Sequence, residues 1–134
     1  PEIVAENLLI YCRNRRAAGW KVVAVTMLPR GSTAEFELRR VRANEIWRAS
    51  TNDYDGLADV AADARIGSPG AQYDLSYYLA DLVHLKSAGY TIVAALVKAQ
   101  IDAIVQPPVA TVLQDFRFQP IFAGADFFPL GNLP

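Results

Sequence analysis

The feature that most constrains the fold of this chain is the apolar run Lys21–Leu28, which reads KVVAVTML. The run is short, rich in β-branched residues and does not alternate between apolar and polar positions. This pattern indicates a strand buried on both faces, as in a parallel sheet. Pro29 and Gly31 end the run, and helical patterns lie before and after it. The sequence therefore predicts an α/β layered domain with a parallel sheet.

The predicted first helix covers about Ile3 to Ala18, and Gly19 is a suitable C-terminal stop for it. Its apolar positions are close to the spacing of an amphipathic helix. Cys12 is the only cysteine, so it has no partner for an internal disulfide, and we expect it to pack as a small hydrophobe. The side chains expected to face the core are those of Val4, Leu8, Tyr11 and Cys12.

The predicted second helix covers Phe36 to Ala49. The segment directly before it, Ser32-Thr-Ala-Glu35, has the S-x-x-E form of a capping box. Ser32 also follows a strand end and precedes a helix, which is where α/β enzymes place nucleophiles. The capping box explains Ser32 without any chemistry. The expected core positions of this helix are Leu38, Val41, Ile46 and Trp47.

A second parallel strand is predicted at Leu57–Ala61, after a turn at Asn52–Gly56. That turn partly matches a calcium-binding loop, but Thr51 and Ala62 occupy two positions that need oxygen-rich ligands, so we predict no calcium site. Only two strands are evident in the chain. A sheet of two strands is small, so we expect further strands from upstream sequence or from a partner.

The third helical pattern extends from Tyr90 to Ile104, and Gln106-Pro107-Pro108 ends it. The tail 106–134 is rich in proline and phenylalanine, and Ala110–Phe118 alternates in part like a strand. We expect the tail to cover an apolar patch, to pair with a sheet edge or to lead into another segment. The expected core positions of the helix are Tyr90, Val93, Ala94, Val97, Ile101 and Ile104.

Charge and composition exclude several classes of function. The net charge of −1 gives no electrostatic reason to expect binding to nucleic acid or to anionic lipid. No uninterrupted apolar run approaches the roughly 18 residues that span a bilayer, so we expect no membrane span. One histidine and one cysteine far apart form no zinc signature, and no glycine-rich phosphate loop is present. We therefore expect no metal and no cofactor.

The single histidine, His84, follows Asp81 by three residues in a predicted turn before the third helix. This spacing lets the carboxylate accept a hydrogen bond from Nδ1–H of the ring, which fixes the tautomer and leaves Nε2 free to take a proton. The pattern therefore indicates an oriented general base. The alternative is a loop histidine whose neighbouring aspartate caps the helix.

The sequence Asp81-Leu-Val-His84-Leu-Lys-Ser-Ala-Gly89-Tyr90, followed by an apolar helix, resembles the closing block of the SGNH (GDSL-type) hydrolases. These proteins are serine esterases and lipases. The resemblance covers about residues 3 to 105 and implies a three-layer α/β/α fold with a parallel sheet, SGNH- or flavodoxin-like. Three earlier segments match family elements in the same order, namely Gly19–Pro29 for a late strand, Arg42…Asn44…Arg48 for the following helix and Asp55–Val60 for the next strand.

The family's nucleophile block, Gly-Asp-Ser, is absent from this chain, as are its oxyanion-hole glycine block and its Gly-x-Asn-Asp block. The resemblance therefore implies that residues 1–105 are the C-terminal half of an SGNH-like domain. The chain also begins with Pro1 inside a helical pattern, which we interpret as the sign of a fragment or a processed chain. The expected partner is the missing N-terminal half of the domain.

By this resemblance, Asp81 orients His84, and His84 is the general base and later the general acid. A serine outside this chain would attack the carbonyl of an O-acyl ester in a carbohydrate or a small molecule. One alternative is a non-catalytic SGNH-like module that serves binding or assembly in a larger protein. A third interpretation, a flavodoxin-like binding domain, is disfavoured because the chain lacks a glycine-rich phosphate loop.

Overall fold

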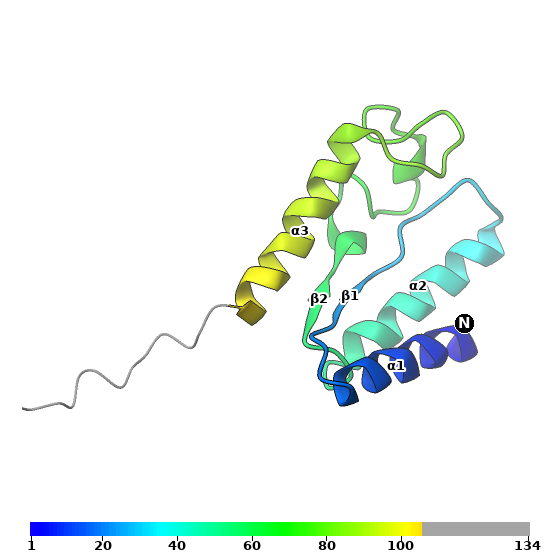
Figure 1. Cartoon of the computed structure of the whole chain (residues 1–134). Coiled ribbons are helices and arrows are strands. Elements are labelled where there is room, and N and C mark those ends of the chain that lie inside the picture. Colours follow the sequence, from blue (N-terminus) through cyan, green and yellow to red (C-terminus); the bar gives the residue numbers. More distant parts are fainter. Residues whose placement is uncertain (106–134) are drawn as a thin grey trace, which may run out of the picture.

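A computed structural model describes residues 1–105 of the chain. Figure 1 shows two helices on one side of a small parallel sheet and a third helix on the other. The α/β class and the predicted order of helices and strands are confirmed. The predicted strand Ala110–Phe118 and the rest of the tail lie outside the described residues. The elements are α1 (Glu2–Ala17), β1 (Val23–Val25), α2 (Ala34–Ala49), β2 (Gly56–Ala58), the 3-10 turns η1 (Val60–Ala62) and η2 (Ala71–Tyr73), and α3 (Ser87–Val105).

Both strands are shorter than the apolar runs that predicted them. β1 and β2 pair in parallel, with Val23 opposite Gly56 and Val25 opposite Ala58. One more bond, from Thr26 N–H to the Ala58 carbonyl (3.2 Å), extends the pairing. Beyond it the chain of β2 turns into η1, so β1 has no strand partner left in the described residues and its ladder ends.

The first core lies between α1, α2 and the sheet. α1 meets α2 through small side chains, because Ala5 and Ala43 are both fully buried. The prediction that Val4 and Tyr11 face the core is wrong, since both are more than half exposed. α1 carries apolar residues on more than one face, so spacing alone did not select the buried one. The buried members of this core are Ala5, Leu9, Cys12, Ala24, Ala43, Trp47 and Tyr54, which confirms the prediction for Cys12 and Trp47.

The inner face of α2 is partly polar, which the apolar pattern did not predict. Leu38, expected in the core, is 72% exposed, whereas Asn44 is 1% exposed and Arg40 is 3% exposed. The Asn44 amide accepts from Met27 N–H (2.8 Å) and donates to the Met27 carbonyl (2.9 Å), to which Arg40 also donates (2.8 Å). These two polar side chains are buried because they bind the backbone N–H and carbonyl of Met27, where the chain leaves β1.

The hydrogen bonds of Asn44 take the place of strand pairing at Met27, on the side of β1 that faces away from β2. Val22 and Thr26 direct their backbone groups toward β2, because Val22 O accepts from Gly56 N–H and Thr26 N–H donates to Ala58. Alternate residues of a parallel strand point their peptide groups to opposite sides, so those of Met27 point away from β2. Asn44 therefore occupies the place where a further strand would bond at Met27.

The second core lies between α3, the loop after β2 and the turn before α3, and its buried members are Val60, Ile66, Tyr78, Leu85 and Ile92. α3 lies directly against β2 at Gly56, where an added Cβ would be only 3.1 Å from Gln100 Oε1 and 3.2 Å from Ile104 Cδ1. Tyr90 and Ile101, expected in the core, are exposed. α3 is therefore apolar on a second face as well as on the face against the sheet.

The apolar character of α3 bears on the expectation of no membrane span. Within the described residues, α3 is the one helix whose length and composition would allow it to cross a membrane, with 19 residues and a mean hydropathy of 1.4. Lys98 and Asp102 interrupt its apolar sequence, so the sequence shows no apolar run of this length. α3 packs against β2 and β1, but only 11% of this apolar stretch is buried in residues 1–105.

We predict that Asn44→Leu lowers the free energy of unfolding by about 1–3 kcal/mol, because Met27 N–H would lose its acceptor at a partly buried position. Urea denaturation of the two proteins measures the difference. Leu38→Ala on the same helix is the control and should change stability by less than about 0.5 kcal/mol, since that side chain is exposed. Equal stability of Asn44→Leu and the unmodified chain would contradict the role given to Asn44.

Candidate active site

The turn that carries the candidate residues is tied to the second core at both of its ends. A short antiparallel bridge joins Tyr78 and Leu85, and both side chains are buried. The Tyr78 hydroxyl donates to the Ile66 carbonyl (2.6 Å), and Leu79 N–H donates to the His84 carbonyl (2.8 Å). The backbone of the turn is thereby fixed close to His84.

Asp81 uses both carboxylate oxygens inside this turn. Its Oδ1 accepts from the backbone N–H groups of Val83 and His84, each at 3.0 Å. Its Oδ2 lies 2.8 Å from Nδ1 of His84, so the contact predicted from the Asp-x-x-His spacing is present. The alternative that Asp81 caps the helix is wrong, because both amides precede α3, which begins at Ser87.

The hydrogen bonds fix the charge of Asp81 and the tautomer of His84. They hold the pKa of Asp81 at about 2, with the bond from His84 N–H contributing most and the ring of His84 next. An ionised carboxylate only accepts hydrogen bonds, so Nδ1 of His84 carries the proton and donates it. The lone pair of neutral His84 is then on Nε2.

His84 is open to solvent, since its side chain is 66% exposed. Nothing in residues 1–105 forms a hydrogen bond with its Nε2. The pair can therefore accept a proton at Nε2 from a group that approaches from solvent. It has the arrangement of a general base held by a carboxylate.

The loop that contains Ser32 lies beside this turn, because Gly31 N–H donates to the Leu82 carbonyl (2.7 Å). The capping box was predicted one residue too early. Thr33, with an extended backbone, caps α2 by accepting from Phe36 N–H (3.2 Å). Ser32 therefore has no capping role, and within the described part of the chain its hydroxyl makes no hydrogen bond with His84.

A polar network at the carboxyl ends of the two strands was not predicted as a unit. Arg48 binds Asp59 through two hydrogen bonds of 2.7 and 2.8 Å, and Thr26 Oγ1 donates to Asp59 (2.9 Å) while accepting from Ala61 N–H (2.9 Å). The Arg48 bonds lower the pKa of Asp59. Because these groups satisfy one another, we assign the network to the fold. No local spacing links residues so far apart in the sequence.

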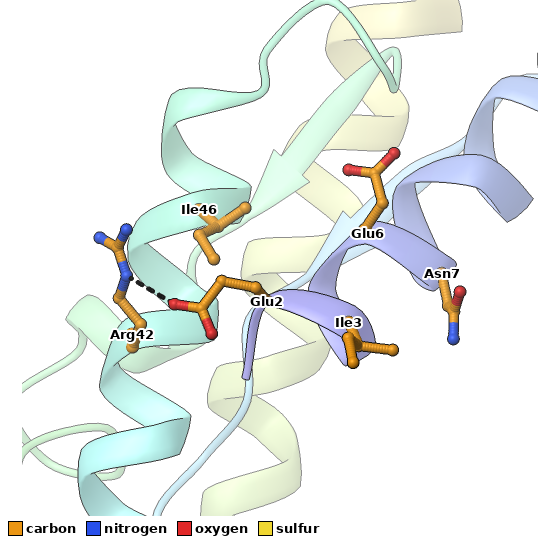
Figure 2. Close-up of a pocket in the computed structure, with 6 residues that line it drawn as sticks. All are labelled: Glu2, Ile3, Glu6, Asn7, Arg42 and Ile46. Carbon is orange, nitrogen blue, oxygen red and sulfur yellow. Dashed lines mark hydrogen bonds and ion pairs between the residues drawn. The ribbon is translucent and has the colours of Figure 1, made fainter.

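A surface hollow of about 560 Å³ lies elsewhere, between α1 and α2 (Figure 2). Glu2 and Arg42 form an ion pair across it at 3.4 Å, and both side chains are more than half exposed. No residue of the turn lines this hollow. In residues 1–105, no three His, Cys, Asp or Glu side chains are placed to hold a metal ion. The Asp81–His84 turn is therefore the candidate site.

The chain matches no protein-family model, no curated protein and no solved structure. The function proposed for it therefore depends on the geometry of the Asp81–His84 turn and on the sequence resemblance described above.

We predict that the Asp81 carboxylate stays ionised well below its ordinary pKa of 3.8. Because the folded-state pKa is lowered, the stability from its hydrogen bonds is complete above about pH 4 and is lost as the pH falls toward 2. The amide chemical shifts of Val83 and His84, followed by NMR, should be constant from pH 5 to 3 and move only near pH 2. Asp81→Asn should abolish this movement, and a midpoint near 3.8 in the unmodified chain would refute the prediction.

Proposed function

We propose that this chain is the part of an SGNH-type serine acyl hydrolase that carries the general base. The observation that supports this most directly is the 2.8 Å contact between Asp81 and Nδ1 of a solvent-exposed His84. In the proposed reaction, Nε2 takes the proton of a serine hydroxyl as the oxygen attacks the ester carbonyl. The imidazolium then returns that proton to the leaving alcohol, and water hydrolyses the acyl-enzyme by the same route.

In this proposal the nucleophile and the oxyanion-hole donors come from outside the chain. The sequence has no Gly-Asp-Ser block, and no serine hydroxyl in residues 1–105 bonds to His84. Asp81 stabilises the imidazolium that forms during the reaction, because its carboxylate is ionised and already bound to Nδ1. The substrate class is an O-acyl ester of a carbohydrate or a small molecule.

The unpaired side of β1 is consistent with the three-layer fold that the resemblance implies. The peptide groups of Val23 and Val25 point away from β2, and Val25 is apolar yet 38% exposed. Strands added at this edge would cover Val25 and enlarge a sheet that is small with two strands. Parallel sheets bind ligands beyond the carboxyl ends of their strands. The carboxyl ends of added parallel strands would lie near the place where the loop of Gly31 meets the Asp81–His84 turn.

The second candidate is a non-catalytic SGNH-like module that serves binding or assembly. The exposed apolar face of α3, which includes Tyr90, Ile101 and Val105, favours an association role. Both candidates use the same surfaces, and they differ in whether a serine reaches His84. A Gly-Asp-Ser block encoded in the same gene upstream of Pro1 would decide against the second candidate.

We predict that His84→Ala in the full product of the gene lowers kcat/KM for p-nitrophenyl acetate by roughly 10⁴-fold, because the serine loses its base. Asp81→Asn should lower it by a similar factor, since the ring loses its fixed tautomer. Lys98→Ala, at an exposed position on α3, is the control and should leave hydrolysis unchanged. Near-normal turnover in His84→Ala would rule out this role for His84.

Labelling with a fluorophosphonate, followed by peptide mapping, locates the nucleophile. We expect no labelling of the isolated chain and labelling of the full gene product at a serine outside residues 1–134. Labelling within these residues that disappears in His84→Ala would place the nucleophile inside the chain, with Ser32 as the first candidate. No labelling of the full gene product would favour the non-catalytic module.

A further inference from the structure

The backbone of the Asp81–His84 turn is strained at Leu82. Its φ of +59° is the only positive value at a non-glycine residue in the part of the chain that the structure describes. A side chain with a Cβ is sterically disfavoured in this left-handed conformation, and a bulky one especially so. Such a conformation persists only where the surroundings hold it.

Two hydrogen bonds hold Leu82 in this conformation. Leu82 N–H donates to the Leu79 carbonyl (3.0 Å), within the turn itself. The Leu82 carbonyl accepts from Gly31 N–H (2.7 Å), which comes from the loop after β1. The second bond connects the turn to a separate part of the fold.

Only a glycine fits at position 31 in this arrangement. A Cβ added to Gly31 would lie 2.9 Å from Leu82 Cβ and 3.3 Å from Leu82 Cδ1. The shorter distance is to the first atom of the Leu82 side chain, which cannot move without moving the backbone of the turn. Any larger residue at position 31 therefore pushes against Leu82.

The loop that carries Gly31 is itself fixed. Pro29 is fully buried, and the peptide of Met27 is bound by Asn44 and Arg40 of α2. The anchors of this loop, at Met27 and Pro29, therefore lie apart from the turn that Gly31 contacts.

We propose that Gly31 is a positioning residue for the Asp81–His84 pair, because it holds Leu82 in the conformation that keeps Asp81 against the amides of Val83 and His84. Leu82 lies between Asp81 and these amides in the sequence, so a change in its backbone angles separates the carboxylate from its donors. The catalytic meaning of this role rests on the function proposed above. The positioning itself is a property of the chain and is measurable without a nucleophile or a substrate.

The test compares Gly31→Ala, Leu82→Gly and the double variant in the 134-residue chain by NMR. His84 is the only histidine, so its ring signals need no separation from others. The readouts are the Nδ1 proton signal, which the bond to Asp81 protects from exchange, and the pH at which the amides of Val83 and His84 report protonation of Asp81.

Gly31→Ala should broaden or abolish the Nδ1 proton signal and move the Asp81 midpoint from about 2 toward its ordinary value of 3.8. The double variant should restore both readouts, because Leu82→Gly removes the side chain that the added methyl group meets, and glycine accepts a φ of +59° freely. Leu82→Gly by itself should leave both readouts as in the unmodified chain.

Gly19→Ala is the control for general destabilisation, because Gly19 has a positive φ (+87°), unlike Gly31, and has no atoms within 4 Å of an added Cβ. It should lower the melting temperature and leave both readouts of the pair unchanged. Unchanged readouts in Gly31→Ala, or no restoration in the double variant, would overturn the proposal. If Gly31→Ala does not fold, the double variant decides, since restored signals support the proposal and absent ones refute it.

Measuring ester hydrolysis by the full gene product distinguishes a failure of this proposal from a failure of the proposed function. If His84→Ala abolishes hydrolysis, Gly31→Ala should lower kcat by about 10–100-fold through misplacement of the base, with a smaller change in KM. If the full gene product does not hydrolyse esters, the NMR outcome still decides whether Gly31 positions the pair.

Discussion

The hydrogen bonds to the backbone N–H and carbonyl of Met27 connect α2 to the end of β1. Asn44 and Arg40 reach from α2 to the point where the chain leaves β1, and they satisfy groups that have no strand beside them. A buried peptide group left without a partner costs about 1–3 kcal/mol, so α2 and the end of β1 separate only at that cost. From this fixed point the chain passes through buried Pro29 to Gly31, which contacts the turn of His84.

The candidate base is held from two directions. Tyr78 and Leu85 tie the turn to the second core, and the bond between Gly31 and Leu82 ties it to the loop after β1. Asp81 is kept ionised by hydrogen bonds rather than by burial, because its side chain is about half exposed. The pair is therefore ordered and accessible at the same time, which suits a base that meets its nucleophile from another segment.

The surfaces that remain exposed fit the same proposal. Val25 on β1 and the second apolar face of α3, with Tyr90 and Ile101, leave apolar area in contact with water. Exposed strand edges and apolar helix faces are characteristic of surfaces that bind further elements. In the proposed hydrolase, the strands that cover Val25 would belong to the half of the domain that supplies the serine.

The sequence by itself determined the features that depend on neighbours a few residues apart. These are the order of helices and strands and the Asp81–His84 contact, whose partners are three residues apart. The period of apolar residues and the spacing of polar ones along the sequence predict such local features directly. The capping residue was predicted one position too early, because Ser32 and Thr33 both carry a hydroxyl that can accept from a helix N–H.

Only the tertiary structure decided which side chains of α2 are buried and what holds the turn of His84. Leu38 is exposed and Asn44 buried because the peptide of Met27, 17 residues from Asn44, needs a partner. Gly31 and Leu82 meet although they are about 50 residues apart, and neither lies in a sequence pattern that indicates the contact. Local spacing carries no information about such partners, because a buried polar or strained group is satisfied by whichever segment the fold brings to it.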